Sequence, residues 1–255
     1  LPSLPADPAD RPHHRPQTLA GGADRPLAAL VAGACALLLR ARRSGSLATG
    51  ALAGVLLAGA VFTKNEGLAL FGVTTLALIL GAPRSGARAW TATAAALGIA
   101  ALLSAPWLIH RAALPAIDEN YAQLFTLERA EYFLTHPERP EDAPTQVKNK
   151  LLENPPMRLP LILGFFGTEF VQPFHWGLLW ILFGFCLPLG AAFRDGEARW
   201  LALLVLGGIL LYALVMLVTT WWVIQLHTTG IPERLLIHLA GPAAMLVGRR
   251  LETGA

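Results

Sequence analysis

The chain has 255 residues, of which 54% are apolar and only 15% are charged, and its mean hydropathy is +0.50. An ordinary globular domain carries roughly 25% charged residues, so this composition argues against a typical soluble domain and favours a membrane protein. The net charge of +3 is compatible with nucleic-acid binding, but the arginines lie in short clusters beside apolar blocks, which membrane topology explains better.

The first 25 residues are predicted to form an external loop. Residues 1–23 contain five prolines and no apolar run, and they show neither an initial methionine nor a signal-peptide pattern. We therefore interpret the chain as the C-terminal part of a longer protein.

Seven apolar blocks after this loop predict an all-α, polytopic membrane helix bundle. With their flanking turns, the blocks approach the ~20 residues that a membrane-spanning helix needs. Four would form a bundle over residues 26–109 and three a bundle over residues 176–250, as parts of one membrane domain. The blocks are Pro26–Leu39, Leu47–Phe62, Leu68–Leu80, Trp90–Ile109, Trp176–Phe193, Trp200–Val223 and Leu235–Val247. The second is rich in glycine and alanine, which lets neighbouring helices approach closely.

Short arginine clusters separate several of these blocks. With seven crossings, all four clusters fall on one side of the membrane, which the positive-inside rule makes cytoplasmic. The turn 64–67, the segment 110–175 and the loop 225–234 then lie on the external face. The clusters are Arg40, Arg42 and Arg43; Arg84 and Arg88; Arg194 and Arg199; and Arg249 and Arg250.

The external segment 110–175 is predicted to contain two surface helices. Aromatic and charged residues alternate over 121–133, a pattern typical of an amphipathic helix. Residues 160–171 are apolar, but a crossing there would invert the last two arginine clusters. We therefore expect an interfacial or re-entrant helix at that position.

Three places on the external face carry residues that could do chemistry. Asp24 precedes a proline, which is an ordinary helix-start signal, so an N-terminal cap and a reactive acid both remain possible. Lys64 and Glu66 form the short turn between two apolar blocks. They are either a solvated, mutually neutralising pair or charges placed at the depth of a lipid phosphate.

The third place is the loop that contains His227 and leads to Arg234 at the start of the last block. A cation at a helix N-terminus opposes the partial positive charge there, so a bound anion would explain it. Snorkelling of Arg234 to the lipid headgroups is the alternative.

Other polar residues of the external segment are weaker candidates. Glu169 is an acid among phenylalanines, and the remaining residues have spacings that match no metal-binding motif. These residues are His110, His136, His175, Asp118 and Glu119.

Three stretches resemble the polyprenol-phosphate-sugar glycosyltransferases of the GT-C fold. The similarity is to family 39, which contains the protein O-mannosyltransferases and the lipid A aminoarabinose transferases. The family's acidic residue before a Leu- and Ala-rich span is matched at Asp24, although Gly22 stands where an aromatic residue is usual. The matching stretches are Ala23-Asp24 with Pro26-Leu27-Ala28; Thr63, Lys64, Glu66 and Gly67 of a Thr-Lys-x-Glu-Gly motif; and His227, Thr228, Thr229, Arg234, Leu235 and Leu236.

The resemblance implies transfer of a sugar from a polyprenyl-phosphate donor to a hydroxyl of a lipid, glycan or protein acceptor. It implies a plasma or inner membrane protein with its active face external or periplasmic. Lys64 and Arg234 would hold the lipid phosphate, Glu66 would hold Lys64, and His227 would bond the phosphate. Asp24 would assist catalysis, by orienting the acceptor or by helping to bind a divalent metal ion.

The family's principal catalytic acid lies in an earlier external loop, and this sequence contains no counterpart, so the enzyme is expected to be incomplete. Two alternatives remain open: a glycan ligase of the O-antigen ligase type, and a multi-pass transporter with Lys64 and Glu66 on its substrate path.

Overall fold

The computed structural model describes residues 22–81, 86–113, 126–137, 157–187, 195–219, 223 and 230–252. Within these ranges the chain is helical, as predicted, apart from turns and one isolated bridge between Pro137 and Met157. The helices in chain order are α1 (Asp24–Ser44), α2 (Leu47–Thr63), α3 (Asn65–Gly81), α4 (Ala87–Ala112), α6 (Leu127–Thr135), α8 (Arg158–Phe170), α9 (Pro173–Trp176), α10 (Leu179–Cys186), α11 (Gly196–Val218) and α13 (Ile231–Glu252).

Local sequence sets the ends of the first helices. Helix α1 stops at Gly45, whose φ of 70° is left-handed and whose N–H bonds the Ala41 carbonyl. Ser46 then caps α2, because its side chain accepts a hydrogen bond from the Thr49 N–H at 3.2 Å. A two-residue connection therefore reverses the chain.

Small residues on α2 bring it against α4, as the glycine-rich second block predicts. A Cβ atom added at Gly50 would lie 2.3 Å from the Ala92 carbonyl oxygen, and one added at Gly54 would lie 2.4 Å from that of Ala96. Such distances leave room for hydrogen only. The spacing of four residues places both glycines on one face of α2, in the manner of helix pairs that pack within membranes.

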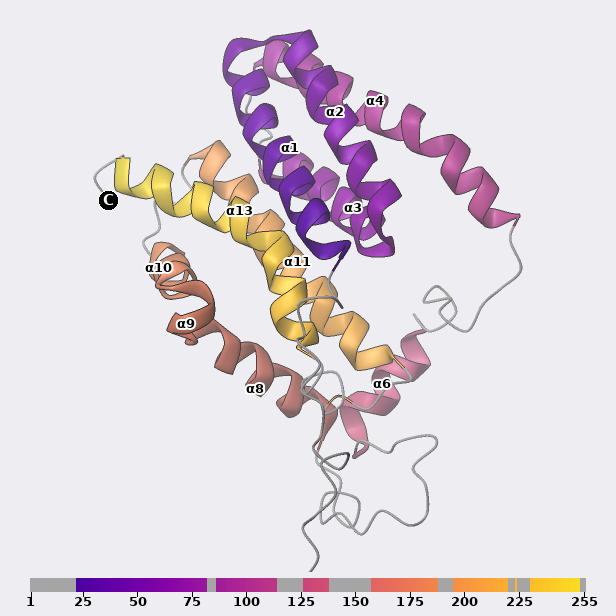
Figure 1. The fold of residues 1–255 in the computed structure, drawn as a ribbon, viewed down its shortest axis with the longest axis vertical. Coiled ribbons are helices and arrows are strands. Elements are labelled where there is room, and N and C mark those ends of the chain that lie inside the picture. Colours follow the sequence, from indigo (N-terminus) through magenta and orange to yellow (C-terminus); the bar gives the residue numbers. More distant parts are fainter. Residues whose placement is uncertain are drawn as a thin grey trace, which may run out of the picture.

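Helices α11 and α13 form the centre of the structure. Figure 1 shows them between α1–α3 on one side and α8–α10 on the other. Trp200 of α11 is fully buried beneath Gly81 at the end of α3, where an added Cβ would meet the tryptophan backbone at 2.6 Å. Two polar side chains, Tyr212 of α11 and His238 of α13, are also buried in this part of the structure.

Two arginines attach helices α6 and α8 to the C-terminal end of α11. Arg129 of α6 donates from Nε to the Val218 carbonyl at 2.6 Å, and Arg158 of α8 donates from Nε to the Met216 carbonyl at 3.2 Å. Both guanidinium groups also lie over the Phe133 ring. The last carbonyls of a helix lack intrahelical partners and carry partial negative charge, so the arginines satisfy them.

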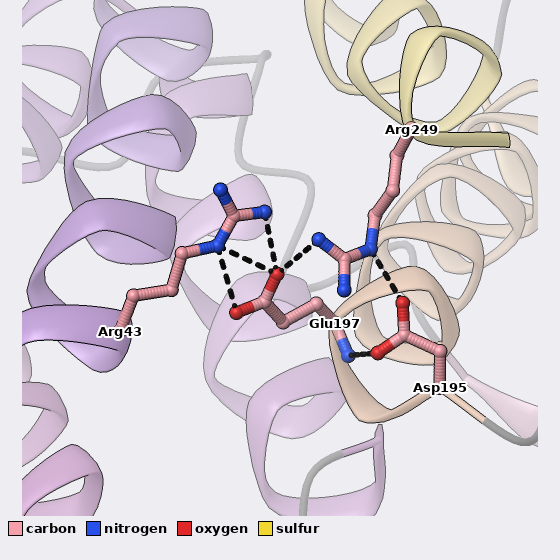
Figure 2. A network of polar contacts seen from close by, with 4 residues as sticks. All are labelled: Arg43, Asp195, Glu197 and Arg249. Carbon is pink, nitrogen blue, oxygen red and sulfur yellow. Dashed lines mark hydrogen bonds and ion pairs between the residues drawn. The ribbon is translucent and has the colours of Figure 1, made fainter. Parts of the chain in front are cut away.

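The opposite end of the bundle gathers the arginines. Figure 2 shows Arg43 of α1 and Arg249 of α13 reaching Glu197 of α11 from two sides, and Arg249 also bonds Asp195. Arg43 Nη2 lies 2.7 Å from Glu197 and Arg249 Nη1 lies 2.6 Å from it. We call these four residues the arginine-end network.

The other described arginines of the predicted clusters lie at this same end. Arg42 bonds Thr93 near the start of α4, and Arg199 bonds the Gly81 carbonyl at the end of α3. An added Cβ at Gly45 would touch Arg88. The described members of the four clusters therefore lie at one end of the helix bundle, while their side of a membrane stays a prediction; Arg84 and Arg194 lie outside the described residues.

The seven-span bundle is not confirmed. Among the described residues, only α4 and α11, with 26 and 23 residues, are long and apolar enough to cross a membrane, which is compatible with a membrane protein; α2 and α3 are apolar but shorter. The predicted block Trp176–Phe193 is interrupted at Gly177, whose φ is 57°. The eight described residues of α10 extend only about 12 Å, against about 30 Å of bilayer hydrocarbon.

Candidate functional site

Residues far apart in the sequence meet at Asp24, the first residue of α1. Its carboxylate is 4% exposed and accepts hydrogen bonds from Lys64 Nζ at 2.8 Å and from Arg234 Nε at 2.7 Å. The two cations come from the α2–α3 turn and from the first turn of α13, and Arg234 is 210 residues from Asp24. The structure therefore brings together three residues to which the resemblance assigns roles in one site.

The α2–α3 turn holds Lys64 in place. Lys64 has an extended backbone between the two helices, and its carbonyl accepts a hydrogen bond from the Gly67 N–H at 3.0 Å. A Cβ added at Gly67 would lie 1.9 Å from the Ala60 carbonyl oxygen, so only glycine lets α3 start this close to α2. Glu66 Oε1 lies 3.3 Å from Lys64 Nζ, which places Glu66 beside Lys64 as the resemblance implies.

Two residues that sequence reasoning did not select extend this site into the core. His238 is fully buried, one helical turn after Arg234; its Nε2 lies 3.3 Å from Asp24 Oδ1 and its Nδ1 lies 3.0 Å from the Tyr212 hydroxyl. A neutral imidazole that donates from Nε2 to Asp24 and accepts from Tyr212 at Nδ1 is compatible with both contacts. The only signal in the sequence is a tyrosine and a histidine inside apolar helices.

We call Asp24, Lys64, Glu66, Tyr212, Arg234 and His238 the Asp24 cluster. Burial raises the pKa of Asp24, but the hydrogen bonds and charges of Lys64 and Arg234 outweigh burial and leave the pKa below its ordinary value of 3.8. Asp24 is therefore a carboxylate at neutral pH. Both of its oxygens are already hydrogen-bonded acceptors.

The two cations retain donors for a further partner. Arg234 contacts Asp24 through Nε alone among the described residues, which leaves its two terminal amino groups, and Lys64 has three N–H groups for its two carboxylate partners. Their side chains remain 34% and 27% exposed. The N-termini of α1, α3 and α13, which carry residues of the cluster, also point partial positive charge at it. Because Asp24 and Glu66 balance the charges of Lys64 and Arg234, an anion here would be held by the remaining N–H donors and the helix N-termini rather than by net positive charge.

The remaining candidates do not join the Asp24 cluster within the described part of the chain. Glu169 is buried and pairs with His175, whose Nδ1 lies 3.2 Å away, while His136 stacks on Tyr132 and His110 lies beside Trp107. Predicted residues outside the described ranges are His227, Asp118 and Glu119.

The described residues contain no group of three or more His, Cys, Asp or Glu side chains arranged to hold a metal ion. The expected divalent metal therefore stays a prediction. No known protein family model, curated protein or solved structure matches the chain. The glycosyltransferase resemblance accordingly rests on the three motifs alone.

Proposed function

We propose that this chain is part of a membrane glycosyltransferase that uses a polyprenyl-phosphate sugar, and that the Asp24 cluster binds the phosphate of this donor. The observation that carries the proposal is the convergence of Lys64 and Arg234 on one buried carboxylate, with both cations partly exposed. Each of the three motifs that resemble family 39 supplies one of these residues. Two cations that a buried acid holds in fixed directions are suitable ligands for a phosphate.

The proposed reaction requires charge stabilisation at the leaving group. The acceptor oxygen bonds to the anomeric carbon of the sugar while the bond from that carbon to the phosphate oxygen breaks. The electron pair stays on the polyprenyl phosphate, where Lys64 and Arg234 would stabilise the developing charge. The proton of the acceptor hydroxyl must pass to a base.

Asp24 is poorly suited to be that base, because its low pKa and its three donors make protonation unfavourable. We assign Asp24 a positioning role: it fixes the directions of Lys64 and Arg234. In the family that the motifs resemble, the principal base lies in an external loop that has no counterpart in this sequence. No step is assigned to a metal ion.

The proposal includes a plasma or inner membrane location with the Asp24 cluster external. Support comes from the distance between the two polar ends: Asp24 and Arg43 lie 19 residues apart on α1, about 28 Å at ~1.5 Å per residue, close to the ~30 Å of a bilayer's hydrocarbon. The arginine end would then be cytoplasmic.

Cysteine labelling tests this orientation. Asn65 and Ser44 are exposed at opposite ends, and both native cysteines are buried. We expect Asn65→Cys to react with a membrane-impermeant thiol reagent in intact cells, and Ser44→Cys to react only after permeabilisation. Labelling of both variants from the same side would contradict the topology.

Donor binding tests the function directly. We expect the purified chain to bind a labelled polyprenyl phosphate, and Lys64→Ala and Arg234→Ala each to weaken binding about 10- to 100-fold. This corresponds to ~1.5–3 kcal/mol for a hydrogen bond to a charged group. Equilibrium binding in nanodiscs measures the effect.

Arg25→Ala is the matched control, because Arg25 is an exposed arginine beside Asp24 that makes no hydrogen bond or ion pair with any described residue. It should change affinity less than twofold. Equal losses in all three variants would indicate unspecific attraction, and undiminished binding in Arg234→Ala would remove the basis of the proposal.

A transporter is the second candidate, because the Tyr212–His238–Asp24 chain carries polar groups into the helix core. Ionisable chains of this kind occur on proton paths through membranes. Proton flux into liposomes that contain the chain, lost in His238→Gln, would favour transport. Donor binding without flux would favour the transferase.

A further inference from the structure

A second candidate site lies at the arginine end, far from the Asp24 cluster. A groove of about 600 Å³ runs between α1 and α13. Its volume falls within the roughly 300–1,000 Å³ of small-molecule sites. The lining residues are Ala36, Leu39, Arg40, Arg43, Ser44 and Met245.

The lining divides into an apolar wall and a charged rim. Ala36, Leu39, Arg40 and Arg43 repeat at helical spacing, so they share one face of α1. Ala36 and Leu39 lie nearer the middle of α1 than the two arginines do, and Met245 lines the groove from α13. The arginines lie at its last turns.

The rim carries positive charge from the two arginines that line the groove. In the arginine-end network, two arginines balance two carboxylates, and Glu197 already accepts from both Arg43 and Arg249. Arg40 adds a charge that no described residue pairs: it is exposed, and its guanidinium makes no hydrogen bond or ion pair within the described ranges. Arg43 remains 57% exposed despite its bond to Glu197.

The position of the groove along α1 fits a lipid of one membrane leaflet. Arg40 is 16 residues from Asp24, about 24 Å along α1 at ~1.5 Å per residue. If Asp24 marks one boundary of the bilayer, the backbone of Arg43 lies near the opposite boundary and that of Arg40 about 6 Å within the hydrocarbon. The long side chain of Arg40 can extend from there to the phosphates, and Ala36 and Leu39 lie at acyl-chain depth.

We propose that this groove binds one anionic phospholipid. Its phosphodiester contacts Arg40 and Arg43, and its acyl chain lies along Ala36, Leu39 and Met245. A zwitterionic lipid is less suitable, because Asp195 and Glu197 are already paired with arginines and only Glu252 of α13 could meet an ammonium headgroup. The inference rests on the proposed membrane embedding but does not require glycosyl transfer.

Native mass spectrometry of the chain released from equimolar phosphatidylglycerol and phosphatidylcholine nanodiscs tests the site. We expect one retained phosphatidylglycerol. Arg40→Gln should lower its retention about fivefold, which corresponds to ~1 kcal/mol per basic residue at a lipid surface. Ala36→Phe should fill the groove and lower retention without changing the charge.

Arg88→Gln and Arg234→Ala are the controls, because Arg88 is an exposed arginine at the same end that does not line the groove, and Arg234 belongs to the other site. Both should keep the lipid. An equal loss in Arg88→Gln, equal retention of phosphatidylcholine, or displacement by millimolar inorganic phosphate would overturn the proposal. A chain that resists carbonate extraction but retains no lipid overturns this site alone; an extracted chain also overturns membrane embedding.

Discussion

Replacing Asp24 with asparagine is expected to lower the free energy of unfolding by about 3 kcal/mol. The substitution leaves Lys64 and Arg234 without their shared carboxylate and removes the charged partner of the buried His238. Breaking a buried ion pair costs ~3–5 kcal/mol, and the partial exposure of both cations places this effect at the lower end. Thermal unfolding in detergent micelles measures it.

Asp195→Asn is the matched control at the arginine end. Asp195 also bonds an arginine, but its side chain is 35% exposed, so its removal should cost at most about 1 kcal/mol. Equal effects of the two substitutions would mean that the Asp24 cluster is an ordinary surface ion pair.

The same carboxylate predicts an acid-dependent loss of stability. Because Lys64 and Arg234 hold the pKa of folded Asp24 below its unfolded value near 3.8, the ionised group stabilises the fold at neutral pH. This contribution declines as the pH falls through about 4 and is lost below the folded pKa. Unfolding measured from pH 7 to pH 3 should show a smaller acid effect in Asp24→Asn than in the unchanged chain.

Replacing Gly67 with alanine is expected to disrupt the α2–α3 turn and, through it, the site. The new Cβ would lie 1.9 Å from the Ala60 carbonyl oxygen, so the backbone must move. Overpacking of this kind costs ~1–3 kcal/mol or more. Because Lys64 and Glu66 belong to the same turn, affinity for polyprenyl phosphate should fall together with stability.

Gly72→Ala on the same helix provides the control. An alanine there meets no atom within 4 Å, and alanine favours a helix over glycine by ~1 kcal/mol. Stability should therefore stay equal or rise, and binding should not change. If Gly67→Ala were equally harmless, the close approach of α2 and α3 would not hold the turn.

The sequence determined the helical elements and the separation of charges. Each predicted apolar block contains or overlaps a helix, because apolar runs bounded by polar turns leave few other ways to satisfy the backbone. Counting the crossings between the arginine clusters predicted that Arg43 and Arg249 lie at one end of the bundle and Lys64 and Arg234 at the other. The structure has the same arrangement.

Only the tertiary structure decided how the residues of the site are paired. The sequence left Asp24 as either a cap or a reactive acid; the structure makes it the shared acceptor of Lys64, Arg234 and His238. The partners of His238 and Tyr212 could not be inferred in advance, since they lie on other helices, up to 214 residues away. Local patterns report which face of a helix is apolar. Which buried polar groups satisfy one another depends on how the helices pack, because a buried donor or acceptor must find its partner wherever the fold brings one.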